Sequence, residues 1–296
     1  MEHRATQFYR GSVGALLQPA VERLRGRGLA RRHRALWKLH RAIWLATRSN
    51  RVQIDGHDLR VDARDSLALA KGWYEPEETA WYSQQVHRGE FVVEAGANIG
   101  FFSLMLARQV GPEGKVLCYE PDPELAAILR RNVEANGYTN VVVRQAAVAD
   151  QPGELTFFRA ARNTGDNRLF THGVDGGSFP VSAVTLDDEL EGETRRIDLL
   201  KLDIQGAEPL ALRGLGRTLR TRPPRRIMME FWPHGIIGMQ EDPRELLESL
   251  LSMGYAASTL HDGAPLEVDR ALAELTSANE EWVNLVLVHE TAGDQP

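Results

Sequence analysis

Apolar residues fall into short runs separated by stretches with helical spacing. Four runs have the length and composition of strands buried on both faces of a parallel sheet, and they cover residues 91–93, 116–118, 141–143 and 197–202. Helix-like segments begin at Phe101 and Pro123 and lie between these runs. This alternation predicts an α/β fold with a doubly wound, mostly parallel sheet.

The second half of the chain continues the pattern. It predicts a helix, a fifth strand ending near Glu230, another helix and two closing strands, the last ones antiparallel. These elements cover residues 207–219, 226–230, 246–253, 255–260 and 282–289. Residues 154–158 and 179–186 are predicted to pair as strands. The polar loop between them is long for a compact domain, and we expect substrate contacts from it; the candidates are Asn163, Asp166, Asn167, Arg168 and His172.

The N-terminal part differs from the rest in charge. Residues 1–51 carry a net charge of +10, and the remainder carries −16. Within this part, 21–47 is predicted to be helical with tryptophans among arginines, and an Asp55-Gly56 hairpin follows. A basic helix of this kind packs on the acidic body, packs on a second copy in a homodimer, or lies on an anionic membrane surface. No nucleic-acid motif accompanies the charge, so nucleic acid is not expected as a partner.

A glycine-rich turn follows the first buried strand, in the segment FVVEAGANIGFF of residues 91–102. Gly96 and Gly100 allow backbone to pass close to a ligand, and Asn98 tolerates the left-handed conformation that such a loop needs. Glu120 ends the second strand, where a carboxylate accepts hydrogen bonds from both hydroxyls of a ribose. This pattern predicts a nucleotide-like cofactor site. The alternatives are that Glu94 only caps the loop and that Glu120 is a solvated strand-end charge.

Acidic residues also follow the later strands. Asp203 ends the strand of 197–202, at the sheet edge where open α/β folds bind ligands, and Glu208 lies in the next helix. Asp203, Glu208 and His234 are the candidate proton acceptors, and Glu230 is a candidate substrate contact. Glu208 would equally serve as a helix-dipole partner, and a lone histidine is often structural. We expect no metal ion.

Four segments together, EAGANIGFFS, YEPDP, LLKLDIQGAE and MEFWP, resemble the marker motifs of the FkbM family of S-adenosylmethionine-dependent methyltransferases. The resemblance runs from about Trp73 to the C-terminus. It implies a class I, Rossmann-like methyltransferase fold with an antiparallel edge strand, over residues 66–296, after a basic helical and hairpin extension of residues 1–65. Glu94, where the family more often has Asp, and Gln205, where it usually has Glu, depart from the pattern.

The resemblance implies particular contacts. Residues 146–150 would border the adenine, although a tight turn explains them equally well, and Tyr74 and Glu75 would cover the cofactor. The expected cofactor-binding residues are Glu94, Gly96, Ala97, Asn98, Ile99, Gly100, Ser103, Glu120, Pro121, Ala147, Val148, Asp150 and Asp203.

The expected reaction is methyl transfer from S-adenosylmethionine to an oxygen, namely a hydroxyl of a small molecule such as a sugar or secondary metabolite. Carboxylate methylation and a non-catalytic scaffold of the same fold remain alternatives. A nicotinamide dehydrogenase is disfavoured because the third glycine of its motif is missing. One cysteine and the lack of a long apolar run lead us to expect a cytoplasmic location.

Overall fold

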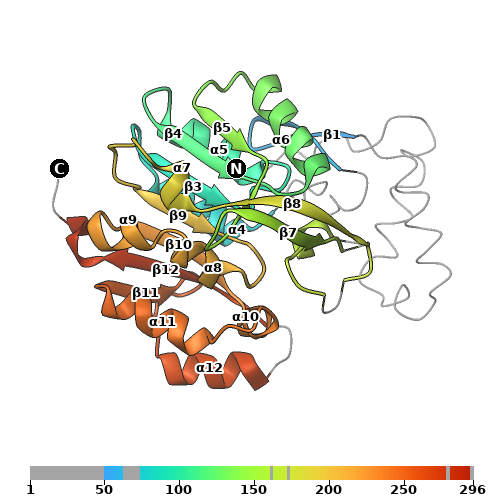
Figure 1. Ribbon diagram of the computed structural model, residues 1–296. Coiled ribbons are helices and arrows are strands. Elements are labelled where there is room, and N and C mark those ends of the chain that lie inside the picture. The colour runs from blue at the N-terminus through green and yellow to red at the C-terminus, as the bar shows by residue number, and fades with distance from the viewer. Residues whose placement is uncertain (1–49, 63–73, 161–162, 172–173, 278–280, 294–296) are drawn as a thin grey trace, which may run out of the picture. The chain divides into compact units, whose positions relative to one another are not determined.

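The computed structural model describes residues 50–62, 74–160, 163–171, 174–277 and 281–293 (Figure 1). The chain divides into two compact units, one ending at Tyr74 and the other beginning at Glu75. The predicted boundary at residue 65, the basic segment 21–47 and the loop residue His172 lie outside the described residues.

The described part of the first unit is a hairpin of β1 (Arg51–Ile54) and β2 (His57–Arg60). Asp55 and Gly56 form its turn with φ of 50° and 80°, which confirms the turn that the sequence predicts.

The second unit is built on a seven-stranded sheet with the order β11-β12-β10-β9-β3-β4-β5. The strands are β3 (Phe91–Ala95), β4 (Lys115–Tyr119), β5 (Val141–Arg144), β9 (Leu199–Leu202), β10 (Arg226–Phe231), β11 (Tyr255–Thr259) and β12 (Val283–His289). β12 runs antiparallel to both of its neighbours, while β5, β4, β3, β9 and β10 pair in parallel. The predicted doubly wound sheet with an antiparallel edge pairing is therefore confirmed.

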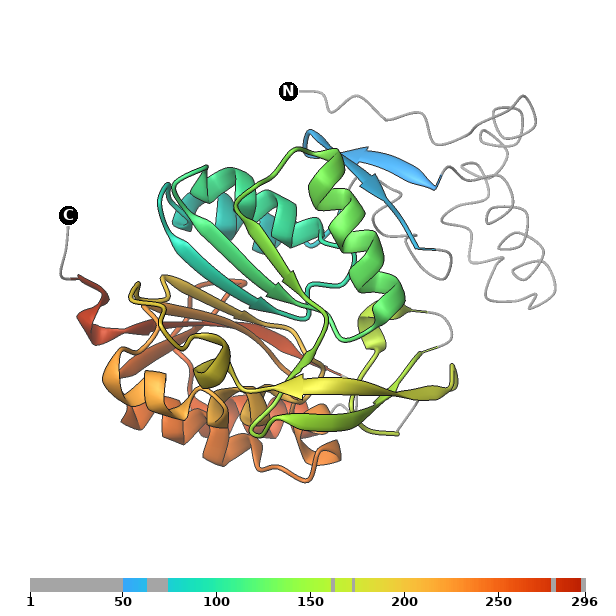
Figure 2. The same cartoon turned by 45° about the horizontal axis from the view of Figure 1, so that its top comes forward.

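Helices cover both faces of this sheet (Figure 2). The helices coloured cyan to green lie above the sheet in Figure 2, and the orange helices lie below it. In chain order, the helices are α4 (Pro76–Gln85), α5 (Phe101–Val110), α6 (Pro123–Ala135), α8 (Glu208–Arg213), α9 (Gly216–Thr221), α10 (Pro233–Gly238), α11 (Pro243–Ser252) and α12 (Val268–Ser277). Because both faces are covered, β3 and β9 are buried along their whole length. No helix of the described residues has the length and apolar composition needed to cross a membrane.

A second, three-stranded sheet carries the order β6-β8-β7. It consists of β6 (Ala147–Val148), β7 (Gly153–Phe158) and β8 (Ser178–Val184), and the antiparallel pairing of β7 with β8 confirms the predicted pair. The 3-10 helix η2 (Thr164–Asp166) lies in the loop between them; the short helix α7 (Leu186–Glu189) follows β8, and η3 (Glu290–Gly293) follows β12.

Two helix predictions need correction. The single helix expected over 207–219 is divided into α8 and α9 at Gly214, where a Cβ would lie 2.0 Å from the carbonyl oxygen of Ala149. This close approach stops the first helix at the backbone of the neighbouring segment. α10 and α12 were not predicted. α10 contains a proline and two glycines, which favour a loop in isolation, whereas the 3.6-residue spacing of Val268, Leu272 and Leu275 would have revealed α12.

Candidate functional site

The loop between β3 and α5 has the left-handed backbone that the sequence predicts. Gly96, Asn98 and Gly100 have φ of 87°, 50° and 93°. A Cβ at Gly96 would lie 1.9 Å from the carbonyl oxygen of Asp203, and one at Gly100 would lie 2.3 Å from Cδ1 of Leu129. These two glycines therefore allow the loop to touch the end of β9 and α6. The structure thus shows a packing reason for both glycines, and close approach of a ligand to them stays a prediction.

Glu120, directly after β4, is buried with 4% of its surface exposed. Its Oε2 accepts a hydrogen bond from the amide of Asn98 at 2.8 Å, and its Oε1 accepts one from the amide of Asp122 at 2.9 Å. The alternative of a solvated strand-end charge is therefore wrong. Burial raises the pKa of Glu120 to about 8, against the opposing effect of the two amides.

The Glu120 carboxylate fits the ribose of a nucleoside cofactor. Each oxygen accepts one backbone N–H, and a carboxylate oxygen has room for a second donor. Two ribose hydroxyls would supply these donors and favour the ionised form, which burial disfavours.

Replacing Glu120 by Gln tests this role and the support that the residue gives to the loop. We expect S-adenosylhomocysteine to bind about 5- to 30-fold more weakly, because one hydroxyl loses its charged acceptor. The free energy of unfolding should fall by about 1–3 kcal/mol, since an amide group now faces a backbone N–H. Calorimetry and urea unfolding measure the two effects. The control is Glu124→Gln on α6, whose side chain is 47% exposed; unchanged binding in a folded Glu120→Gln protein would contradict the ribose role.

Glu94 and Ser103 contact each other rather than standing free. The Ser103 hydroxyl donates to Oε2 of Glu94 at 2.6 Å, and both residues are almost completely buried. Burial raises the pKa of Glu94, against the lowering effect of Lys201 and of the serine. This hydrogen bond joins the end of β3 to the first turn of α5, and these are the two elements that flank the cofactor loop. The pair therefore stabilises the conformation of the loop.

Lys201 is a buried cation in the middle of β9, with 2% of its surface exposed. Its ammonium lies 2.9 Å from Oδ2 of Asp203 and 5.0 Å from the centre of the Phe102 ring. Burial opposes its charge, but Asp203, Glu78 and Glu94 outweigh that effect and raise the pKa of Lys201. The backbone amide of Asp203 donates to the carbonyl of Ala95 at 3.1 Å, which fixes Asp203 beside the cofactor loop.

Carboxyl groups from four elements surround this lysine, and we call them, with Lys201, the Lys201 cluster; its carboxyl members are Glu75, Glu78, Glu94, Asp203 and Glu230. Burial, and then the charge of Asp203, raise the pKa of Glu75 and of Glu230. Gln205 bridges two members, because its Nε2 donates to Oε1 of Glu230 at 2.7 Å and lies 3.5 Å from Oδ1 of Asp203. The departure from the family pattern at Gln205 thus supplies a donor where a glutamate would add another negative charge.

The ionised form of Glu78 is disfavoured by burial and by the neighbouring carboxyl groups. Its carboxylate accepts from Asn284 at 3.0 Å and from the Tyr82 hydroxyl at 3.3 Å, yet burial raises its pKa to about 7. Because the pKa in the folded state lies above the usual value, Glu78 costs little stability below about pH 4.5 and the full amount above about pH 7.

We therefore expect Glu78→Gln to stabilise the protein relative to the wild type as the pH rises. The gap in the free energy of unfolding should widen by about 1–3 kcal/mol between pH 5 and pH 8. Urea unfolding at the two pH values measures this gap, and Glu113→Gln at an exposed position is the control. A gap that does not change with pH would show that Glu78 is ionised without cost.

The two other candidate proton acceptors, Glu208 and His234, have different surroundings. Glu208 is fully buried; its Oε1 accepts from the amide of Ile204 at 3.1 Å, and its Oε2 has no hydrogen-bond partner among the described residues. Burial raises the pKa of Glu208 to about 8, and Asp203 adds to this shift. His234 lies in the first turn of α10 with its ring 5.8 Å from that of Trp232. Glu208 thus supports the turn after Asp203, and His234 belongs to the aromatic group around Trp232.

The residues expected around the adenine are held by protein contacts. Ala147 and Val148 form β6 and pair in parallel with β8. Asp150 lies 3.3 Å from Nη2 of Arg213 in an ion pair. Ala97 and Ile99 are buried, and the Asn132 side chain donates to the carbonyl of Ile99 at 2.8 Å, while Pro121 lies directly after Glu120. The role of these residues towards a cofactor stays a prediction.

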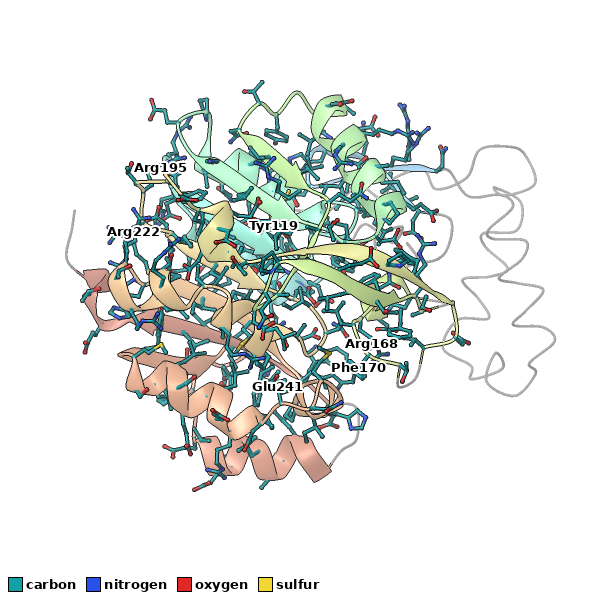
Figure 3. All side chains as sticks on the ribbon, in the orientation of Figure 1. Tyr119, Arg168, Phe170, Arg195, Arg222 and Glu241 are labelled. Carbon is teal, nitrogen blue, oxygen red and sulfur yellow. The ribbon has the colours of Figure 1, made fainter. Side chains whose placement is uncertain are left out.

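The long loop is tied to the end of β10 through Arg168. The Arg168 guanidinium lies 5.1 Å from the ring of Phe170 and 5.0 Å from that of Trp232, and Figure 3 shows Arg168 and Phe170 next to each other. Asn163 accepts from the amide of Gly165 at 3.0 Å and so forms the turn itself, and Asn167 accepts from the amide of Ala160 at 3.0 Å. These two asparagines shape the loop, and their contact with a substrate stays a prediction. Tyr74 belongs to the other compact unit.

Sequence reasoning missed the centre of the cluster. Lys201, Glu78 and Tyr82 come from β9 and α4 and were not named as functional residues. A signal for Lys201 was present, because a lysine inside the otherwise apolar run IDLLKLD must be buried with a partner if the strand is covered on both faces. The glutamates of α4 gave no such signal, since acidic residues are common in the first turn of a helix.

A sheet of this order, with a glycine-rich loop after β3 and an acid after β4, defines a class I methyltransferase fold. The model of the methyltransferase FkbM domain matches residues 94–256, which is more than half of the chain. The chain therefore belongs to the FkbM family of methyltransferases, and S-adenosylmethionine is its methyl donor.

Known proteins agree with this assignment in sequence. The chain is 32% identical to "Methyltransferase sdnD" of Sordaria araneosa over 178 residues, which cover 49% of the chain and 68% of that protein. It is 30% identical to "Methyltransferase 1" of Beauveria bassiana (strain ARSEF 2860) over 146 residues, which cover 42% of the chain and 58% of that protein. Among solved structures, it is similar to the O-methyltransferase of Bacillus cereus in complex with SAH, with a TM-score of 0.41, 17% identity and coverage of 73% and 82% of the two chains.

Proposed function

We propose that this methyltransferase acts on a hydroxyl oxygen of a small molecule, such as a sugar or another secondary metabolite. In this proposal Glu230 takes the proton of the acceptor hydroxyl, and Asp203 binds the amino group of the cofactor's methionine part. Bound S-adenosylmethionine supplies a methyl carbon that is open to in-line displacement, so the protein has to align the acceptor and remove its proton.

The observation that carries the proposal is the excess of carboxyl groups in the Lys201 cluster. One buried ammonium faces several carboxyl groups beside the cofactor loop. A negatively charged acceptor would be repelled at this place, whereas a neutral hydroxyl would find hydrogen-bond acceptors and a base. This favours a hydroxyl over the alternative of a carboxylate acceptor.

The contacts of the two acids support different roles for them. The Asp203 carboxylate is already neutralised by Lys201 at 2.9 Å. Among the described residues, its Oδ1 has only the distant Gln205 amide at 3.5 Å, and it is available to a cofactor ammonium. Glu230 is half-buried and oriented by Gln205, and the raised pKa of its carboxyl makes it a stronger proton acceptor than an ordinary glutamate when it is ionised. The positive charge of a bound sulfonium would favour that ionised form.

A label-transfer assay tests the proposal. The full chain is incubated with S-adenosylmethionine carrying a tritiated methyl group and with fractionated metabolite extracts, and labelled products are treated with mild alkali. Methyl ethers from hydroxyl acceptors should keep the label, whereas methyl esters from carboxylates would release it as methanol. Alkali-labile products would contradict the hydroxyl target, and cofactor binding without transfer to any acceptor would favour the non-catalytic scaffold.

A further inference from the structure

A basic cleft lies at the edge of the central sheet opposite to the cofactor loop. β9 and β10 run in parallel and begin there, and the reversed strand β12 ends there. The cleft has a volume of about 540 Å³, and its lining includes Arg196, Arg220, Arg222, His289 and Thr291. In Figure 3 the labelled Arg222 lies on the far side of the molecule from Arg168 and Phe170. Asp203 and the cofactor loop follow the carboxyl ends of β9 and β3, so the cleft is separate from the methyl-transfer site.

The charges of this cleft are not balanced by its own residues. Among the residues that the structure describes, three arginines line it and no carboxylate does. Three carboxylates lie close to the lining residues in sequence. Glu290, between His289 and Thr291, is exposed and does not line the cleft. Glu193 lies 3.1 Å from Arg195 and 3.2 Å from Lys115, and Asp198 lies 3.0 Å from Arg225. Burial and the neighbouring charge of Arg225 lower the pKa of Arg196, as expected for a guanidinium among other cations.

Two of the arginines are held in place by neutral acceptors. Arg196 donates to the carbonyl of Pro223 at 2.6 Å and to the hydroxyl of Thr291 at 3.0 Å. Arg222 donates to the carbonyl of Glu193 at 2.7 Å and to that of Thr194. A guanidinium has five N–H donors, so each of the two side chains keeps three for a ligand while its direction is fixed.

The third arginine is the most accessible. Arg220 is exposed on the last turn of α9 and makes no ion pair among the residues that the structure describes. The C-terminal carbonyls of α9 attract cations, but a helix end carries only about half an elementary charge. One helix end therefore does not account for three guanidinium groups around one cleft.

We propose that this cleft binds a small anion that carries two or more phosphate groups. Phosphate oxygens match the planar fork of a guanidinium, and several oxygens are needed to engage three arginines at once. A volume of about 540 Å³ is in the range of small-molecule sites and exceeds what a single phosphate fills. His289, whose Nδ1 lies 2.8 Å from the Thr291 hydroxyl, closes one side of the cleft.

Calorimetry with inorganic pyrophosphate on the full chain tests the proposal. The wild type should bind pyrophosphate, and the double variant Arg220→Gln, Arg222→Gln should bind it at least about tenfold more weakly, because two charge-assisted contacts are lost. The basic residues before position 51 also attract anions, so the comparison between variants carries the test. Arg131→Gln, at an exposed position on α6, removes one of the same charges elsewhere and should change the affinity less than about twofold.

Two further measurements make the outcome unambiguous. S-adenosylhomocysteine affinity and the thermal midpoint of unfolding should be unchanged in Arg220→Gln, and this single variant carries the test if the double variant does not fold. Absence of pyrophosphate binding to the wild type would overturn the proposal. A loss of pyrophosphate affinity in Arg131→Gln as large as that in the cleft variant would overturn it too. Methyl transfer is assayed separately, so failure of this cleft leaves the proposed function untouched.

Discussion

Glu230→Gln is expected to lower kcat by about 10²- to 10⁴-fold, because the acceptor hydroxyl loses the group that takes its proton. The amide keeps the shape of the side chain and still accepts a hydrogen bond from Gln205, which lies 2.7 Å from Oε1 in the wild type. S-adenosylhomocysteine affinity should stay within about twofold, since an interaction made only in the transition state is removed. Steady-state kinetics with an acceptor found in the label-transfer assay, together with calorimetry, measure the two quantities.

Asp203→Asn is the matched variant, since it removes one carboxylate of the same cluster. If Asp203 holds the amino group of the cofactor, S-adenosylhomocysteine affinity should fall by about 5- to 30-fold, and kcat should fall less than in Glu230→Gln. The reverse pattern, with full affinity and a large loss of kcat in Asp203→Asn, would make Asp203 the base, and full activity of Glu230→Gln would remove Glu230 from the reaction.

Lys201→Met is expected to destabilise the protein by about 3–5 kcal/mol at pH 8, which is typical when one partner of a buried ion pair is removed. Asp203 would lose its ion-pair partner, and the carboxyl groups of Glu78 and Glu94 would lose the cation that now lowers their pKa. The pKa values of Glu78 and Glu94 would then rise further. The decrease in the free energy of unfolding should therefore be largest at a pH above these pKa values and become smaller as the pH falls towards 5. Urea unfolding at pH 5 and pH 8 measures it.

Lys115→Met provides the control for this change. Lys115 is also a strand lysine above a phenylalanine ring, but its side chain is 31% exposed and pairs with Glu193 at 3.2 Å. A partly exposed pair of this kind contributes at most about 1 kcal/mol. An equal decrease in the free energy of unfolding in the two variants would show that Lys201 does not balance the negative charge of the cluster. A decrease in Lys201→Met that does not depend on pH would show the same.

Much of the fold follows from local signals. The buried runs at 91–93 and 116–118 are too apolar to face water on either side, and they become β3 and β4 of the central sheet. The helix starting at Pro123 combines proline at its first position with a cap from Asp122, whose side chain accepts from the amide of Glu124 at 2.9 Å. The helix expected over 207–219 was divided because Gly214 meets the backbone of Ala149, which is distant in sequence and invisible to a local pattern.

In the candidate site, too, some features follow from local sequence and others depend on contacts between distant residues. Asn98 was correctly expected in a left-handed conformation, since few residue types tolerate it. The packing reason for Gly96 was invisible to a local pattern, because its neighbour is the carbonyl of Asp203, more than a hundred positions away. Glu120 was identified by its position after a strand, but nothing local revealed that two backbone amides occupy its oxygens.

The sequence by itself determined the order along the chain of the strands in the central sheet, the turn geometry at Asn98 and the acids that end β4 and β9, because apolar periodicity and backbone sterics act over a few residues. Only the tertiary structure decided which carboxyl groups meet Lys201, that Gln205 bridges Glu230 and Asp203, and that three arginines share a cleft at the opposite edge. Electrostatic energy depends on distances and burial in space, and these are set when distant segments pack together.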